Sequence, residues 1–152
     1  MKTLANEAER VEILARMGCV KTDSARRFGK MSAHQMVCHL ADSFRGVIGE
    51  RPLSVVPGNF GRGVVKWVAL YSGLRWPHGL KTMPEVDQLI GGSRPVEFTA
   101  DVQQLRTLFE RFTAQRRDFV WGRHPMFPAM TEADWMRWGY LHMDHHFRQF
   151  GV

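Results

Sequence analysis

The sequence has few cysteines and lacks a long apolar run. Its two cysteines, Cys19 and Cys38, do not form a C-x-x-C pair, which argues against a zinc ribbon or a dithiol redox motif and favours a reducing compartment. No apolar run approaches the roughly 20 residues that a membrane span needs. The first residues, MKTLANEAERVEILARMG, lack the apolar segment and cleavage site of a secretory signal. We therefore expect a cytoplasmic protein with no membrane partner.

The sequence also lacks a block of like charge. Its 21 Lys and Arg residues outnumber 15 Asp and Glu residues and give a net charge of +6, but they are spread along the chain. Proteins that bind nucleic acid usually concentrate such charge in one patch or stripe. We expect no specific nucleic-acid partner, and any binding to duplex DNA should be weak and sensitive to salt.

No segment alternates apolar and polar residues as a half-buried strand would, whereas several show helical spacing. The length and the 44% hydrophobic content fit a single domain spanning 1–152. We predict an all-α bundle with a four-helix core, an additional short helix and long loops. The predicted helices are about Thr3–Met17, Ser32–Gly49, Gly61–Leu74, Glu97–Arg117 and Thr131–Phe150.

Helix ends and loops can be predicted from particular residues. Ser32 with Gln35, and Thr131 with Asp134, have the spacing of N-terminal capping boxes. Proline and glycine recur between residues 75 and 95, so we expect a long ordered loop or lid there, and residues 121–130 form a second loop. On the first helix, the residues predicted to face inward are Leu4, Val11 and Leu14.

Three of the seven histidines lie in the segment LHMDHHFRQF, residues 141–150. At 100° per helical residue, His142, His146 and Gln149 fall on one stripe, which Trp135 and Trp138 share. We predict that this stripe faces the bundle interior. His145 lies at its border, where surface exposure is expected, although a role beside the ligands or as an alternative ligand stays open.

The helix predicted from residue 32 places His39 at the edge of its buried face, with Ser43 beside it and with His34 and Cys38 on the polar side. One inward histidine opposite a pair four residues apart is what a three-histidine metal site requires. Zn²⁺ accepts three imidazoles and keeps a position for water or substrate, and nickel or ferrous iron would also accept them. Hydrogen-bonded core histidines are the alternative at this point.

Two neighbouring patterns are weaker. The position after His142 is Met143, so the glutamate of the H-E-x-x-H protease motif is missing. Cys38 stands beside His39, but adjacent helical residues diverge by about 100°, which makes a nucleophile and base pair improbable. We therefore predict neither proteolysis nor a cysteine nucleophile.

The segments CHLADSF and HMDHHFRQF resemble those of the DinB-like superfamily of metal-binding four-helix bundles, and the C-terminal segment is most similar to an uncharacterised bacterial branch of it. That superfamily has one histidine on an early helix and two, four apart, on the last. The resemblance implies that His39, His142 and His146 are metal ligands and that Gln149 stands at the superfamily's glutamine spacing. The two residues between His146 and Gln149 depart from its usual Arg-Gly.

The resemblance implies a metal-dependent transferase-like or hydrolase-like enzyme that acts on a small molecule, with a low-molecular-weight thiol as cosubstrate, and it implies a homodimer. No catalytic residue is assigned. The residues expected to orient ligands or substrate or to wall the pocket are Gln149, Ser43, Trp135, Trp138 and His145. A non-catalytic stress-response or binding module, with structural histidines and a basic surface for an acidic partner, is the alternative.

Overall fold

Five α-helices and one turn of 3-10 helix make up the fold in a computed structural model that describes residues 1–56 and 61–152. Within these residues there is no strand, so the predicted all-α class is confirmed. None of the described helices is both long enough and apolar enough to cross a membrane. The elements are α1 (Glu7–Cys19), α2 (Ala33–Val47), α3 (Arg62–Tyr71), η1 (Pro84–Val86), α4 (Phe98–Thr113) and α5 (Glu132–Gln149).

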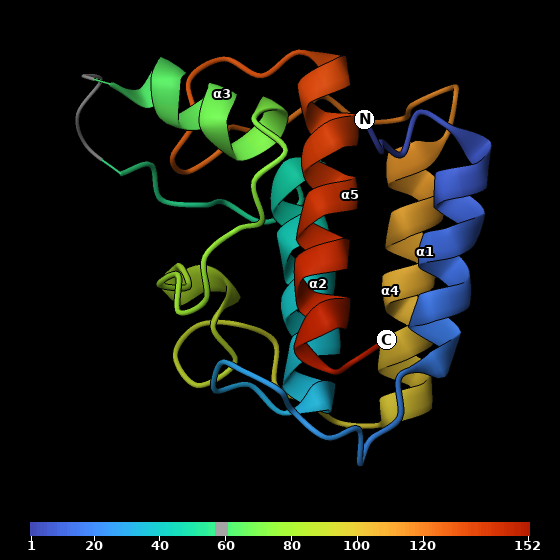
Figure 1. The fold of residues 1–152 in the computed structure, drawn as a ribbon. Helices are drawn as coiled ribbons and strands as arrows, with labels where there is room; N and C mark the ends of the chain where they lie inside the picture. Colours follow the sequence, from blue (N-terminus) through green and yellow to red (C-terminus); the bar gives the residue numbers. More distant parts are fainter. Residues whose placement is uncertain (57–60) are drawn as a thin grey trace.

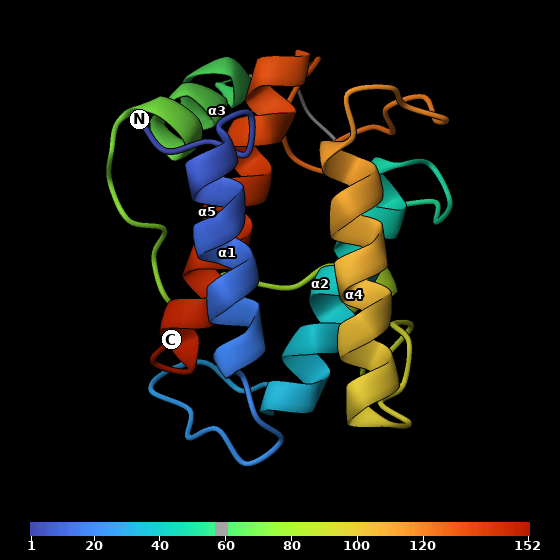
Figure 2. The ribbon, with the colours of Figure 1, turned by 90° about the vertical axis from the view of Figure 1, so that its right-hand side faces the viewer.

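Four helices run side by side as a bundle, and the short α3 lies across one end (Figure 1). Helix α2 packs against α4, and α1 packs against α5 (Figure 2). Large side chains that are almost fully buried fill the space between the helices, as helical bundles require. Among them are Phe44, Phe109, Phe112, Trp135 and Phe147. The bundle therefore holds α2 and α5, which carry the histidines of interest, in one core.

Both predicted capping boxes are confirmed. Ser32 and Gln35 exchange side-chain and backbone hydrogen bonds at the start of α2, and Thr131 and Asp134 do the same at the start of α5. Each box satisfies N–H groups that have no partner within the helix. The first residues of the two histidine-bearing helices are thus defined locally by their own side chains.

The prediction for the first helix was wrong in its start and in one inward residue. Helix α1 begins at Glu7 because the side chain of Asn6 accepts a hydrogen bond from the N–H of Ala8 and caps it. Leu4 is buried, but it precedes the helix and donates its N–H to Met136 on α5 at 3.1 Å. Val11 is 60% exposed, because the face of α1 that packs into the bundle carries Ile13 and Met17 instead.

Two other helices are shorter than predicted at their C-terminal ends. Helix α3 stops at Tyr71, and Gly73 follows with a φ of +78°, a conformation that glycine adopts without strain. Helix α4 ends at Thr113 because Ala114 takes an extended conformation, and Asp118 then pairs with Arg111 at 2.8 Å. Neither change alters the bundle.

The segment between residues 75 and 95 is a long loop as predicted, but it contains the element η1, which was not expected. The loop is fastened to α2 by the carboxylate of Asp42, which is fully buried. Asp42 accepts hydrogen bonds from the backbone N–H of Ser93 at 2.6 Å and from its hydroxyl at 2.8 Å. Arg45 and Arg51 balance its charge at 2.8 and 3.2 Å. Asp42 thereby holds this loop against α2 at Ser93.

Candidate metal centre

Helices α2 and α5 bring together the three histidines that the sequence singled out. His39 comes from α2, and His142 and His146 come from α5, four residues apart. One ring nitrogen of each lies within 4.8 Å of those of the other two. The ring centroids are 5.2 Å apart for His39 and His142, 4.7 Å for His39 and His146, and 4.9 Å for the α5 pair. The three imidazoles therefore surround a common point, and we refer to them as the histidine triad.

Two nitrogens of the triad are already at the spacing of metal ligands. The Nε2 atoms of His39 and His142 are 3.2 Å apart. In a tetrahedral zinc site with bonds of 2.0 to 2.1 Å, two ligating nitrogens lie about 3.3 Å from each other. The same distance also suits a hydrogen bond between two neutral imidazoles. The orientation and the burial of the three rings therefore have to distinguish a metal site from a hydrogen-bonded pair.

Hydrogen bonds from outside the triad orient two of its rings. His39 Nδ1 lies 2.8 Å from the backbone carbonyl oxygen of Val86, and His146 Nδ1 lies 3.0 Å from the amide oxygen of Gln149. Both oxygens only accept, so each Nδ1 donates. The Nε2 atom of each neutral ring then keeps a free lone pair. Metal-binding histidines are commonly oriented in this way.

Burial keeps the triad uncharged. His39 is 5% exposed and His146 is 8% exposed. Burial lowers the pKa of His39 below its ordinary value, and burial with the neighbouring histidines lowers the pKa values of His142 and His146 well below theirs. Neutral imidazoles are the form that coordinates a cation. The chemistry of the donor set therefore fits a divalent metal of the zinc type.

The lowered pKa values predict how the metal-free protein responds to acid. Because the unfolded chain takes up these protons near the ordinary pKa of 6.5 and the folded chain does not, stability is present above that pH and is lost as the pH falls below it. Each such histidine contributes about 1.4 kcal/mol per pH unit. We would measure the free energy of unfolding by urea, with a chelator present, between pH 6.5 and 5. Its change per pH unit should be smaller for His146→Gln than for the wild type. An equal pH dependence of the unfolding free energy in the two proteins would contradict the assignment of His146 as a buried neutral group.

The triad approaches the surface on the side of His142, which is partly exposed whereas His39 and His146 are buried. Trp138 packs on His142 with ring centroids 4.8 Å apart, and Trp76 does so at 5.9 Å. Next to them, Phe28 and His78 stack at 3.7 Å and lie over His145. Rings from two loops thus cover this side of the triad and would line a path to it.

The other residues predicted for the site are not all in contact with the triad. Trp138 touches it, whereas Trp135 lies a layer behind, stacked at 5.7 Å on Trp121. Ser43 is buried on α2 and has no hydrogen bond to a triad histidine among the described residues. His145 is 8% exposed, so the expectation of surface exposure was wrong, because the loops that carry Phe28 and Trp76 fold over it.

Sequence reasoning missed several groups that shape the site. The carbonyl of Val86 orients His39, yet a backbone group has no signature in the sequence. Asp42 is three residues after His39 and could have been suspected, because a carboxylate on a buried helical face needs partners.

Cys38 was placed on the polar side but is 3% exposed, since α4 covers that face of α2. Burial and the nearby Asp101 raise the pKa of the Cys38 thiol to about 12, which does not suit a nucleophile.

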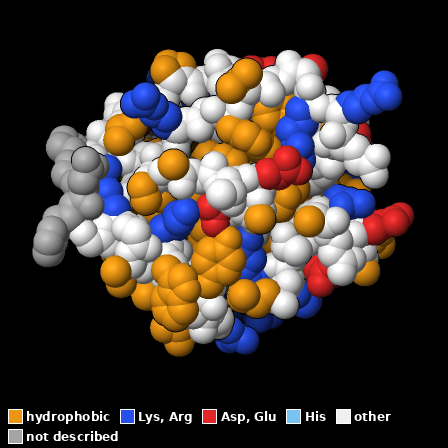
Figure 3. Space-filling view, turned by 90° about the horizontal axis from the view of Figure 1, so that it is seen from above, with side chains coloured by type: hydrophobic (Ala, Val, Ile, Leu, Met, Phe, Trp, Pro, Cys, Tyr) orange, Lys and Arg blue, Asp and Glu red, His pale blue; other side chains and the backbone are white. Residues whose placement is uncertain are grey.

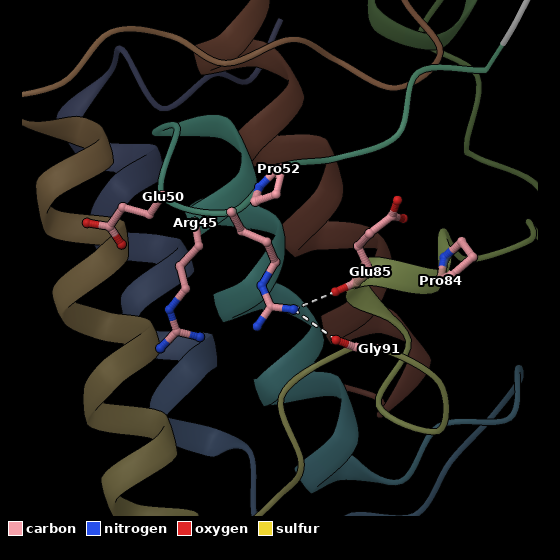
Figure 4. Close-up of a pocket in the computed structure, with 7 residues that line it drawn as sticks. Arg45, Glu50, Pro52, Pro84, Glu85 and Gly91 are labelled. Atoms are coloured by element: carbon pink, nitrogen blue, oxygen red, sulfur yellow. Dashed lines mark hydrogen bonds between the residues drawn. The ribbon is translucent and has the colours of Figure 1, made fainter.

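Two surface cavities are present among the described residues, and no triad histidine lines either of them. The first, of about 500 Å³, is lined by Arg45, Arg51 and residues of η1 (Figure 4), and both arginines are already paired with Asp42. The second, of about 290 Å³, includes Trp76, which also packs on His142, but its lining continues to Tyr140 and Asp144, which lie opposite His142 around α5 by helical geometry. We assign neither cavity to the triad.

Gln149 offers a direct test of how the triad is oriented. It is 3% exposed, and its amide packs so closely on Gly29 that a Cβ added there would overlap the amide nitrogen. Gln149→Ala should keep the fold but lower the affinity of the triad for zinc by about 10- to 100-fold, since it removes the acceptor for His146 Nδ1. Competition with a chelating dye measures this. Gln149→Glu, which keeps an acceptor, is the control, and equal affinity in all three proteins would exclude an orienting role.

Comparisons with known proteins bear on the whole chain. No curated protein and no solved structure gives a match. A family described as a protein of unknown function (DUF1569) matches residues 1–151. The chain therefore belongs to the DUF1569 family.

Proposed function

We propose that this protein binds a divalent metal ion through His39, His142 and His146. The observation that carries the proposal is the 3.2 Å separation of two Nε2 atoms in a neutral cluster in which Val86 and Gln149 already bind the outer nitrogens of His39 and His146. Zinc suits three neutral imidazoles best, and nickel or ferrous iron are the alternatives. In addition, the outer hydrogen bonds of His39 and His146 leave the Nε2 lone pairs of both rings available to an ion that His142 also reaches.

The proposed activity is transfer or hydrolysis on a small molecule, with a low-molecular-weight thiol as cosubstrate. When bound, the metal would supply Lewis-acid activation of a thiol or water near neutral pH. Trp138 and Trp76 would pack against an apolar part of the substrate where His142 approaches the surface. Gln149 would hold His146 in the required orientation. Three protein ligands leave a position for substrate, which supports a catalytic over a purely structural site.

We infer that the family is related to the DinB-like superfamily of four-helix bundles. The support is the placement of one histidine on α2 and of two, four residues apart, on α5, in a bundle with an extra short helix. Gln149, three residues after His146, contacts that histidine directly. The thiol-dependent activity proposed above rests on this relationship.

The thiol part of the proposal is testable with cobalt in place of zinc. We would use a Cys19→Ser, Cys38→Ser variant, so that no sulfur of the protein's two cysteines can contribute. Adding a cellular thiol to the cobalt-loaded variant should produce a near-ultraviolet sulfur-to-cobalt charge-transfer band and shift the visible bands. Turnover is then sought by offering electrophilic small molecules with that thiol. No spectral change with any common thiol, and no turnover, would remove the enzyme proposal and leave a metal-binding protein.

A non-catalytic binding module is the second candidate, and one surface observation favours it. The outer face of α3 exposes apolar side chains, with Val64 at 67%, Trp67 at 59% and Val68 at 39%. Seen from the α3 end of the bundle, apolar side chains gather in patches while basic ones are scattered (Figure 3). A second copy of the chain, as a homodimer, would cover such a face. Any turnover by the wild-type protein would argue against this purely binding role.

A further inference from the structure

A second cluster of metal-ligating side chains lies between α2 and α4. His34 and Cys38 come from α2, and Asp101 comes from the first turns of α4. A nitrogen, a sulfur and an oxygen of the three lie within 4.8 Å of one another. His34 Nε2 is 2.6 Å from Asp101 Oδ2, which also accepts from the backbone N–H of Val96 at 3.1 Å. The three donors therefore converge from two helices that pack directly against each other.

This cluster is separate from the histidine triad. Cys38 and His39 are adjacent on α2, so their side chains diverge by about 100°. His39 faces α5 and contacts His142, whereas Cys38 and His34 face α4. Helices α4 and α5 lie on different sides of α2 (Figure 2). Neither cluster contributes a ligand to the other.

The two clusters are built in the same way. Each takes two donors four residues apart on one helix, where Cβ atoms lie about 5 to 6 Å from each other, and a third from a neighbouring helix. In the triad the pair is His142 and His146 with His39 opposite. In the second cluster the pair is His34 and Cys38, with Asp101 opposite.

We propose that His34, Cys38 and Asp101 form a second divalent metal site, with zinc as the preferred ion. Zinc accepts an imidazole nitrogen, a thiolate sulfur and a carboxylate oxygen in one tetrahedral shell, whereas calcium and magnesium require oxygen ligands and would not use the cysteine. Binding releases the Cys38 thiol proton to solvent, and the sulfur then bonds to the metal. The proposal does not depend on the function proposed for the triad.

The local structure can accommodate an ion with small movements. The 2.6 Å contact between His34 and Asp101 has to open to about 3.3 Å, which side-chain rotation provides. The side chains of His34 and Asp101 keep 16% and 19% exposure, so an ion and a water as fourth ligand can reach the site. Cys38 closes it from within at 3% exposure. An ion here would tie α2 to α4, which suits a structural site.

Cobalt spectroscopy distinguishes this site from the triad, because the triad has no sulfur. In a Cys19→Ser background, which removes the exposed cysteine, cobalt-loaded protein should show a near-ultraviolet thiolate-to-cobalt charge-transfer band. Cys38→Ser should abolish that band and lower the zinc content from two ions per chain to one. Asp101→Asn should weaken zinc binding at this site by at least about 10-fold while the chain stays folded by circular dichroism.

Variants of the triad complete the test. His142→Ala in the same background should keep the charge-transfer band, since Cys38 and the triad are independent. Saturating cobalt without any charge-transfer band would overturn the second site and leave the triad untouched. A band that disappears in His142→Ala would also overturn it, because the sulfur would then belong to the triad. If the parent protein shows the band but binds no zinc at the triad, only the proposed function is contradicted and the second site stands.

Discussion

His142→Ala should lose high-affinity metal binding at the triad. His142 is the most exposed member of the triad, so its removal disturbs the core least. Losing one of three ligands should cost more than losing an outer hydrogen bond, so we expect the zinc affinity to fall by at least about 100-fold. Competition with a chelating dye, in a Cys38→Ser background that silences the second cluster, measures this at one site.

We also expect zinc to raise the melting temperature of the parent protein more than that of His142→Ala. At free zinc of 100 times the dissociation constant, binding stabilises the folded chain by about 2.7 kcal/mol. The Cys38→Ser parent should therefore melt at a lower temperature after chelation, whereas the same free zinc should stabilise His142→Ala in that background by no more than about 0.4 kcal/mol. His78→Ala is the matched control, because His78 stacks on Phe28 outside the triad. Zinc affinity in His142→Ala equal to that of the parent would rule out the triad as the binding site.

Asp42→Ala should cause the largest loss of folding stability among single changes near the site. The substitution leaves Arg45 and Arg51 without their shared carboxylate and removes both acceptors of Ser93. Because Asp42 is fully buried and the arginines are mostly buried, we expect the free energy of unfolding to fall by about 3 kcal/mol. Urea unfolding of the metal-free protein measures this change.

Two further variants show whether the effect has the proposed cause. Asp42→Asn keeps an oxygen acceptor and should lose less stability than Asp42→Ala. Glu132→Ala removes an ion pair with Arg117 in which the glutamate is 60% exposed, and should change stability little. Asp42→Ala should also lower zinc affinity at the triad by about 10-fold, since the loop that carries Val86 is released. Unchanged stability and unchanged affinity in Asp42→Ala would contradict the role assigned to this carboxylate.

Much of the fold was predictable because its signals are local. Capping boxes at Ser32 and Thr131 mark where α2 and α5 begin, and the 3.6-residue period places His142 and His146 on one stripe. The convergence of His39 with that stripe was predicted from its place at the edge of the buried face of its helix, together with the resemblance to the DinB-like superfamily. The same reasoning could not locate the start of α1, because an asparagine cap competes with good helix formers before it.

The remainder depends on contacts between distant segments. A period assigns faces to a helix but does not say which face a neighbouring helix covers, so Cys38 and His145 were expected outside and are buried. The acceptor for His39 is a main-chain carbonyl 47 residues away, positioned by a loop that Asp42 holds. No residue pattern encodes that contact. The cluster of His34, Cys38 and Asp101 likewise appears only once α4 is placed beside α2.

The most direct measurement is an anomalous-scattering map of crystals of the zinc-loaded protein, prepared without an affinity tag and recorded at the zinc absorption edge. The account predicts a peak at about 2.0 to 2.1 Å from ring nitrogens of His39, His142 and His146, with Nε2 of His39 and His146 facing it. A map from zinc-saturated protein with no peak between these three rings would contradict the central claim.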